Sequence, residues 1–116
     1  MNKVVLITGG ARGIGSAIAL ELAKHGYDIV INNLTSKQPA KELKEKIESE
    51  YHVRCLTICA DVSDVDQVNI MVSEVEEKMG GVDILINNAA VDLSNLFHLK
   101  NAEEFKRTLD VNVVGA

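Results

Sequence analysis

The stretch TGGARGIG, Thr8–Gly15, decides the fold of this chain. The apolar run VVLIT, Val4–Thr8, leads into it and has the length and β-branched content of a buried strand. The segment that follows, Gly15–Gly26, carries apolar residues at helical spacing and ends on a glycine. A glycine-rich turn between a buried strand and a helix predicts the first strand–helix unit of an α/β fold.

The same alternation of strand and helix patterns continues along the chain. Apolar runs of strand length lie at Asp28–Asn32, Arg54–Asp61 and Val82–Ala90, and helical patterns at Thr35–Glu50, Ser63–Gly81 and Asn101–Ala116. We expect Ser63 and Asp66 to form a capping box at the start of one helix, and Gly80-Gly81 to end it. Strands that alternate with helices predict a doubly wound parallel sheet, here one domain over residues 1–116.

Composition and charge argue against several classes of protein, including nucleic-acid-binding, membrane-spanning and secreted proteins. The net charge is −5 and no basic patch is present, which argues against a nucleic-acid partner. No apolar run approaches the roughly 18 residues of a membrane span, and the N-terminal run is too short for a signal peptide. Cys55 and Cys59 are expected to be buried free thiols, too far apart along a strand for a disulfide. A cytoplasmic protein without a metal site is the expectation.

The glycine turn itself points to a ligand. Glycines at 9, 13 and 15 let the backbone turn sharply and approach a bound molecule closely. The free N–H groups at the start of the helix then suit a pyrophosphate. The spacing, G-x-x-x-G-x-G, differs from the general dinucleotide fingerprint G-x-G-x-x-G. Tight packing of strand on helix without a ligand is the alternative.

Four motifs in order carry a family resemblance. They are Thr8-Gly9-x-x-x-Gly13-x-Gly15, Asp61-Val62, Asn87-Asn88-Ala89-Ala90 and Asn112. With them the whole chain resembles the N-terminal half of the short-chain dehydrogenases/reductases, and it looks most like the 3-oxoacyl-[acyl-carrier-protein] reductases and related sugar or alcohol dehydrogenases. The resemblance implies a Rossmann-type sheet, truncated after the fourth strand and the helix that follows it.

The resemblance also implies a cofactor site. Asp61 matches the residue that binds the adenine amino group, Val62 offers backbone beside it, and Asn88 matches a residue lining the adenosine ribose. The full set of cofactor-binding residues is Gly9, Arg12, Gly13, Ile14, Gly15, Asn33, Asp61, Val62, Asn88 and Ala89. If the family resemblance is set aside, the sequence explains Asp61 and Asn87-Asn88 equally well as turn-forming residues. Ala90 departs from the usual Asn-Asn-Ala-Gly, with a minor effect expected on the backbone.

The end of the second strand bears on the choice of cofactor. NAD-binding folds usually carry a carboxylate there for the ribose 2′-OH, whereas this chain has INNLTSK. Arg12 in the glycine turn and Lys37 just past the strand are cations that suit a 2′-phosphate. NADP(H) is therefore expected rather than NAD, although Lys37 is also explained as a solvated lysine.

Asn112 falls within the apolar stripe of the helix predicted over Asn101–Ala116. That stripe consists of Phe105, Leu109, Val113 and Ala116. A buried Asn needs hydrogen-bond partners, so a packing role is one interpretation. The resemblance implies another, in which Asn112 is the Asn of an Asn-Ser-Tyr-Lys catalytic set and holds a water in a proton relay. Val111 and Val114 lie on the opposite side of this helix, which in the family forms subunit contacts.

The remaining catalytic groups of the family are not in this sequence. The family needs Tyr-x-x-x-Lys, but Tyr27 is followed four residues on by Ile31 and Tyr51 by Cys55. The catalytic Ser should follow a fifth strand, which the sequence pattern does not show. The complete enzyme would transfer hydride between nicotinamide and a small-molecule ketone or secondary alcohol, while this chain alone is expected to be inactive.

Two consequences follow for the chain as a whole. Without a fifth strand, the run VDILIN is expected to be an exposed apolar edge, which invites pairing with another chain. A homo-oligomer formed through that strand or through the Asn101–Ala116 helix is therefore expected. A noncatalytic dinucleotide-binding or interaction module is the alternative function, and a mis-terminated chain without activity is a third.

Overall fold

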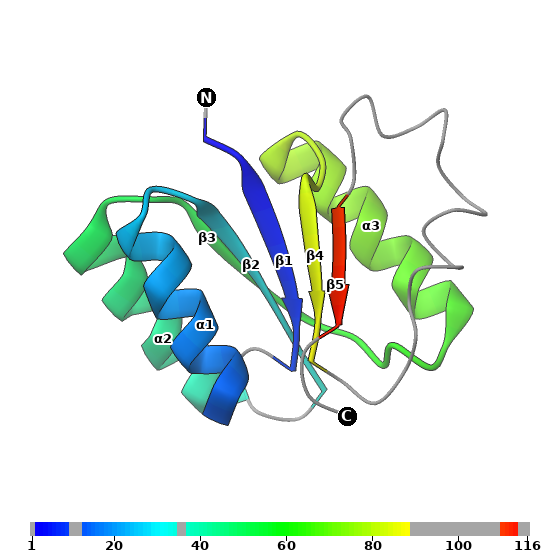
Figure 1. The fold of residues 1–116 in the computed structure, drawn as a ribbon. Helices are drawn as coiled ribbons and strands as arrows, with labels where there is room; N and C mark the ends of the chain where they lie inside the picture. Colours follow the sequence, from blue (N-terminus) through cyan, green and yellow to red (C-terminus); the bar gives the residue numbers. More distant parts are fainter. Residues whose placement is uncertain (1, 10–12, 35–36, 89–109, 114–116) are drawn as a thin grey trace.

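The computed structural model describes residues 2–9, 13–34, 37–88 and 110–113. These residues form a sheet and three helices (Figure 1). The strands are β1 (Val4–Thr8), β2 (Asp28–Asn33), β3 (Cys55–Cys59), β4 (Ile84–Asn87) and β5 (Asp110–Val113), and the helices are α1 (Gly13–Lys24), α2 (Lys37–Tyr51) and α3 (Val65–Met79). Within these ranges no helix has the length and apolar character needed to cross a membrane.

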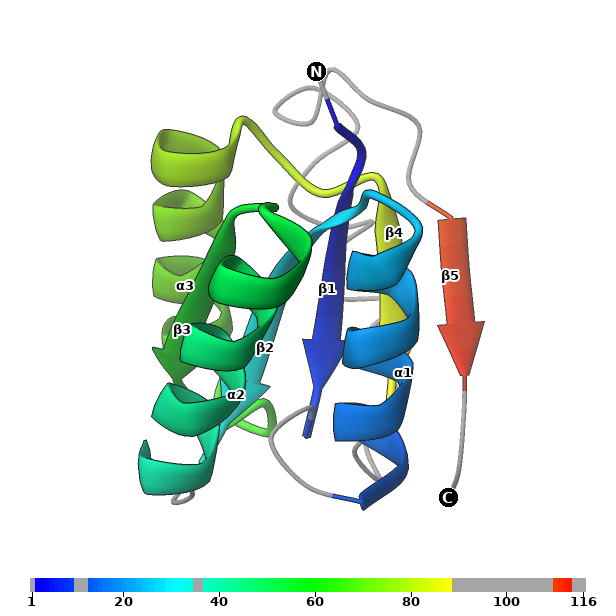
Figure 2. The same ribbon diagram turned by 90° about the vertical axis from the view of Figure 1, so that its left-hand side faces the viewer.

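The sheet has the strand order β3-β2-β1-β4-β5, and every pair of neighbouring strands is parallel. Helices α1 and α2 cover one face of the sheet and α3 covers the other (Figures 1 and 2). The predicted doubly wound α/β architecture is therefore confirmed.

Burial on both faces explains the continuous apolar runs of the central strands. Val5 and Ile7 of β1 pack with the helices α1 and α2, whereas Val4 and Leu6 pack in the cluster that contains α3. All four side chains are completely buried. A strand covered on both sides needs apolar residues at every position, because neither face meets water.

The ends of the helices differ in detail from the sequence prediction. Asp64 caps α3 in place of the predicted Ser63, since its carboxylate accepts hydrogen bonds from the backbone N–H groups of Asp66 and Gln67. The capping-box prediction is therefore wrong, because an aspartate one residue further on competes successfully for the same N–H groups. Gly80 ends α3 as predicted, in a left-handed conformation with φ of 84°.

The helix predicted over Asn101–Ala116 is wrong for residues 110–113. These four residues form β5, which pairs with β4 so that Asn112 lies level with Ile86. Two of the four residues of DVNV are β-branched valines at alternate positions, which favours a strand once an open sheet edge is available. The helical pattern reflects only the spacing of neighbouring residues. The backbone N–H and C=O groups of β4 can instead pair with residues 110–113, which are distant from β4 in the sequence. The rest of the predicted helix lies outside the described residues.

The position of β5 also corrects the expectation for the fourth strand. β4 pairs with β1 on one side and with β5 on the other, so it is not the exposed edge that the sequence predicted. Self-association through an open β4 is therefore excluded in this structure, and DVNV does not offer the helical face that the second predicted route required.

The two cysteines lie at opposite ends of β3 and have different surroundings. Both are free thiols, as predicted. Cys55 is buried, and its burial, assisted by the charge of Glu48, raises the pKa of the thiol to about 12. Cys59 is exposed, contrary to the prediction, because β3 is an edge strand of the described sheet, and its sulfur donates to the carbonyl of Leu34 at 2.9 Å.

The amino ends of the strands are tied by an ion pair. Asp28 begins β2 and is almost fully buried, and its carboxylate contacts the guanidinium of Arg54 at 2.8 Å. Arg54 also donates its backbone N–H to Asp28 at 2.9 Å, and Asn2 donates its side-chain amide at 3.2 Å. Burial alone raises the pKa of this carboxyl, but the hydrogen bonds and the charge of Arg54 outweigh it and lower the pKa.

Candidate functional site

The carboxyl ends of β1, β2, β3 and β4 meet at one edge of the sheet, where α1 also begins (Figures 1 and 2). The chain runs from β1 to β2 and β3 on one side and then returns to β4 on the other side of β1. The carboxyl ends of β1 and β4 therefore mark the topological switch point, outside which open α/β sheets bind ligands. This carboxyl edge holds four of the predicted residues: Gly9, Asn33, Asp61 and Asn88.

Hydrogen bonds join β1 and β4 across the switch point. The buried hydroxyl of Thr8 donates to the side-chain oxygen of Asn87 at 3.0 Å and accepts the backbone N–H of Asn88 at 2.9 Å. The side-chain amide of Asn88 donates to the carbonyl of Gly9 at 3.2 Å. The start of the glycine turn is thus fastened to the end of β4, and Asn88 lies against that turn.

The glycine turn has the backbone that only glycine adopts readily. Gly9 and Gly13 have φ of 64° and 55°. No described atom lies within 4 Å of the position that a Cβ on Gly13 would take, so the backbone rather than crowding requires glycine there. Gly15 is buried in α1, and the neighbouring Ile14 is 60% exposed. Two further predicted residues, Arg12 and Ala89, lie outside the described residues.

The turn after β3 places Asp61 at the same edge. The N–H of Ala60 donates to the carbonyl of Asn33 at 3.0 Å, and the side chain of Asn32 donates to the carbonyl of Ala60 at 3.1 Å. These bonds fix the chain just before Asp61. The hydroxyl and then the N–H of Ser63 donate to Asp61 and lower the pKa of its carboxyl. Val62 turns inward and is buried in the cluster beneath α3.

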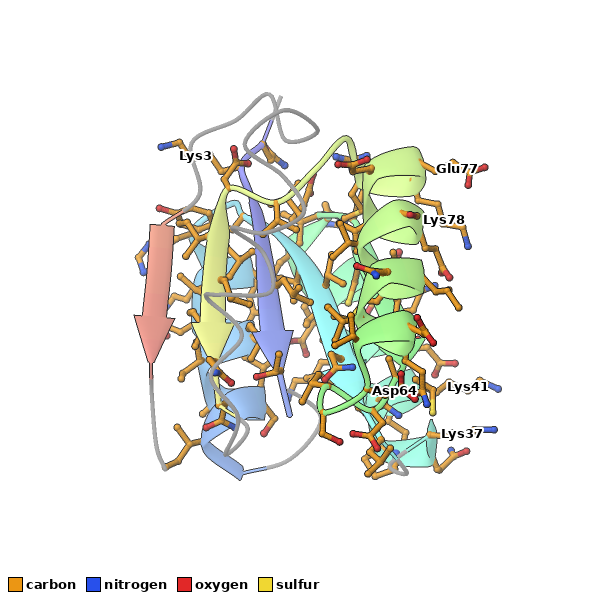
Figure 3. All side chains as sticks on the ribbon, turned by 90° about the vertical axis from the view of Figure 1, so that its right-hand side faces the viewer. Lys3, Lys37, Lys41, Asp64, Glu77 and Lys78 are labelled. Atoms are coloured by element: carbon orange, nitrogen blue, oxygen red, sulfur yellow. The ribbon has the colours of Figure 1, made fainter. Side chains whose placement is uncertain are left out.

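Lys37 and Asn112, the predicted cofactor cation and the predicted catalytic residue, lie on different elements. Lys37 begins α2 and is exposed, and Figure 3 shows it with Lys41 and Asp64 at the end of the molecule to which the strand arrows point. Asn112 lies in β5, level with Ile86 of β4. The site thus brings together the predicted adenosine-side residues, and it does not test the catalytic role of Asn112.

Both tyrosines lie at the other edge of the sheet. Tyr27 precedes β2 and Tyr51 ends α2, and both are half-buried against the α1–α2 core. These are the only tyrosines in the sequence, so none of its phenols is at the carboxyl edge. Among the described residues there is also no cluster of His, Cys, Asp or Glu that could hold a metal ion.

Three residues at this edge were not among the predicted site residues. Thr8, Ser63 and Gln67 each hydrogen-bond to a predicted residue or to its neighbour. Thr8 had a usable signal, because a hydroxyl that ends an otherwise apolar buried strand must find a partner. Gln67 had none, since its bond to the backbone of Asp61 depends on the bend between β3 and α3.

A hollow lies away from this edge. It has a volume of about 490 Å³ and runs along the outer face of α3, where the residues that line it are Asn69, Ile70, Ser73, Glu74, Glu77 and Lys78. Among the described residues, the lining side chains all belong to α3 and include none of the predicted site residues. The hydrogen-bonded carboxyl edge, rather than this surface of α3, is the candidate ligand site.

The sequence profile of the family described as short chain dehydrogenase matches residues 3–116. The chain therefore belongs to the short-chain dehydrogenase family, and within it the chain is similar to reductases of the FabG type at moderate identity. It is 38% identical over 115 residues to the 3-oxoacyl-[acyl-carrier-protein] reductase FabG of Staphylococcus aureus, a match that covers 99% of this chain and 46% of the relative. The chain thus spans about half the length of the curated relatives it matches.

Solved structures of the family have the same fold. NAD+-bound xylitol dehydrogenase is similar with a TM-score of 0.71 and 30% identity, covering 77% of this chain and 34% of that one. L-sorbose reductase from Gluconobacter frateurii, solved with NADPH and L-sorbose, gives a TM-score of 0.70 and 35% identity, covering 89% of this chain and 38% of that one. Nicotinamide cofactors are therefore bound by these relatives, in both the NAD and the NADP form.

Proposed function

We propose that this chain is the cofactor-binding half of an NADP(H)-dependent oxidoreductase that resembles the 3-oxoacyl-[acyl-carrier-protein] reductases. The reaction is hydride transfer between the nicotinamide and a ketone or secondary alcohol. The observation that carries the proposal is the glycine turn, fastened through Thr8 and Asn88 to β4 across the switch point. A cytoplasmic location also belongs to the proposal, supported by the two free thiols.

The residues at the carboxyl edge fit the adenosine and pyrophosphate parts of a dinucleotide. Gly13 has the positive φ and the open space that a closely approaching ligand needs. The N–H groups in the first turn of α1, a helix of 12 residues, suit a pyrophosphate. Asp61 offers a carboxylate to the adenine amino group. Asn33, Val62, Arg12 and Ala89 complete the proposed contacts at this edge.

A preference for NADP(H) is supported by the charges around the end of β2. Asn33 ends this strand, and no carboxylate follows it before Lys37. The relatives do not decide between the cofactors, because one is solved with NAD+ and another with NADPH. Arg12 and Lys37 supply the positive charge that a 2′-phosphate requires.

The chain of 116 residues is proposed to bind cofactor without turning it over. Bound nicotinamide supplies the hydride, but the reaction also needs a proton donor at the carbonyl oxygen, and acid–base catalysis commonly contributes about 10²–10⁴ in rate. Tyr27 and Tyr51 lie at the opposite edge. This placement favours a second candidate function for the chain by itself, a noncatalytic dinucleotide-binding module. Asn112 then keeps its proposed relay role only in a complete enzyme.

Titration of the chain with NADP+ and NAD+ tests the proposal. We expect saturable binding that is roughly tenfold tighter for NADP+, because one arginine–phosphate contact contributes about 1.5–3 kcal/mol. Arg12→Ala should abolish this preference, whereas Lys46→Ala on the exposed side of α2 should preserve it. Equal affinity for the two cofactors in the unaltered chain contradicts the NADP assignment.

Turnover is a separate measurement on the same sample. Mixing the chain with NADPH and a 3-oxoacyl thioester should leave the nicotinamide absorbance unchanged. Oxidation of NADPH that depends on the thioester contradicts the proposal that this chain is inactive alone, and it also excludes the noncatalytic module.

A further inference from the structure

The two oxygens of the Asp61 carboxylate have different surroundings. Oδ1 accepts the hydroxyl of Ser63 at 2.6 Å and the N–H of Ser63 at 2.9 Å. In the part of the chain that the structure describes, Oδ2 has no hydrogen-bond donor. One oxygen is therefore saturated by protein donors, and the other is available to a ligand at the carboxyl edge.

The backbone of Asp61 is held as firmly as its side chain. Its N–H donates to the side-chain oxygen of Gln67 at 2.8 Å, and its carbonyl accepts the N–H of Asp64 at 3.0 Å. Gln67 is itself held by Asp64, to which its amide donates at 3.3 Å. The residue before, Ala60, is fixed to the end of β2 through both of its backbone groups. The two hydrogen bonds from Ser63 then limit rotation of the carboxylate.

We propose that Ser63 is a positioning residue, which turns the Asp61 carboxylate so that Oδ2 accepts the exocyclic amino group of a purine. The inference rests on the proposed function, which places adenosine at this edge. An ionised carboxylate only accepts hydrogen bonds. It therefore favours adenine, which has an amino donor at position 6, over hypoxanthine, which has a carbonyl acceptor there. Because Ser63 orients the Asp61 carboxylate before the nucleotide binds, less conformational entropy is lost when the carboxylate accepts the amino group.

The role of helix cap does not account for Ser63. Asp64 occupies the cap position of α3 and accepts from both N–H groups that a cap satisfies there. The hydroxyl of Ser63 points back to Asp61 instead. The low pKa of Asp61 agrees with this, because its largest cause is the hydrogen bond from the Ser63 side chain.

The test compares two nucleotides that differ in the group at position 6 of the base and in the proton on the adjacent N1, adenosine 2′,5′-bisphosphate and inosine 2′,5′-bisphosphate. Calorimetric titration of the unaltered chain should give tighter binding of the adenosine compound. Ser63→Ala should reduce this preference roughly fivefold to tenfold, the size of one hydrogen bond to a charged group. Ser63→Thr should restore it, since threonine has the same hydroxyl. Ser49→Ala, which removes a serine hydroxyl from the exposed side of α2, is the matched control.

The outcomes separate this inference from the proposed function. Failure of both nucleotides to bind overturns both. Equal binding of the two bases, or an unchanged preference in Ser63→Ala, overturns the inference alone and leaves the cofactor site standing. A second readout serves if Ser63→Ala folds poorly: the pKa of Asp61, followed by carboxyl NMR, should be the same in Ser63→Thr as in the unaltered chain. If the pKa of Asp61 is higher in Ser63→Thr than in the unaltered chain while the preference for the adenosine nucleotide is retained, the positioning role of Ser63 is also overturned.

Discussion

Thr8 shows at the scale of one residue how distant parts of this chain are joined. Its hydroxyl bonds to Asn87, which is 79 residues away in the sequence, and to the N–H of Asn88. Asp28 has the matching role at the other edge, where it holds Arg54. Each is a buried polar group with its partners in place, and such groups are expensive to leave unpaired.

Replacing Thr8 with valine should destabilise the chain. Valine has nearly the same shape but no hydroxyl, so the side chain of Asn87 and the N–H of Asn88 each lose a buried partner. We expect a loss of about 2 kcal/mol in the free energy of unfolding, measured with urea. Thr57→Val on the half-exposed part of β3 is the control and should change it by less than about 0.5 kcal/mol. Equal losses in the two variants contradict the role given to Thr8.

Asp28 should make stability depend on pH in the acid range. Its pKa in the folded chain is below the ordinary value near 4, so its stabilisation is complete above that value and is lost as pH falls through the folded pKa. Asp28→Asn should cost about 2 kcal/mol at pH 7, since it leaves the half-exposed Arg54 without its counter-charge. The difference between variant and unaltered chain should shrink at pH 3.

The exposed Glu77 supplies the comparison for this prediction. Glu77→Gln changes the net charge by the same amount but lies on the outer side of α3, so its urea curves should follow those of the unaltered chain at both pH values. An Asp28→Asn deficit that is the same at pH 3 and pH 7 contradicts the ionic role of Asp28.

At the scale of the element, the sequence predicted the first four strands and the helices between them. Runs such as VVLIT are unambiguous because a strand buried on both faces is apolar throughout. The glycine turn was equally clear, since its residues need a backbone that few others adopt. Prediction failed where neighbours that are distant in sequence decide the outcome. Cys59 is exposed because β3 lies at an edge, and the strand order was not readable from the pattern.

The site was predictable to a similar extent. Gly9, Asp61 and Asn88, which the motifs singled out as cofactor-binding, each follow a strand at the same edge, because parallel strands place their carboxyl ends together. The hydrogen bonds that hold them were not predictable. Ser63 has a capping pattern in the sequence, and only the position of Asp64 shows that the hydroxyl serves Asp61 instead.

The conformation of β5, which the sequence pattern predicted to be helical, can be checked directly. Residues 110–113 fit a helical stripe, yet they pair with β4 as a strand. The Cα and Cβ chemical shifts of these four residues, measured by NMR in the 116-residue chain, should have the signs typical of extended backbone. Helical chemical shifts for these residues would contradict the five-stranded sheet, and β4 would then be an edge strand.

At the scale of the whole molecule, the two edges of the sheet have different roles. The amino edge is closed by the ion pair of Asp28 and Arg54 and carries both tyrosines. The carboxyl edge carries the glycine turn, the start of α1 and the open oxygen of Asp61. A chain built this way is expected to bind a dinucleotide at the carboxyl edge only.

Mapping where NADP+ binds tests this central claim most directly. Backbone amide NMR spectra of the chain, recorded as NADP+ is added, should show saturable shifts at Gly9, Gly13, Asp61 and Asn88. The amides near Arg54 at the amino edge should stay unchanged. Absence of any shift, or shifts confined to the amino edge or to the outer face of α3, contradicts the assignment of the carboxyl edge as the cofactor site.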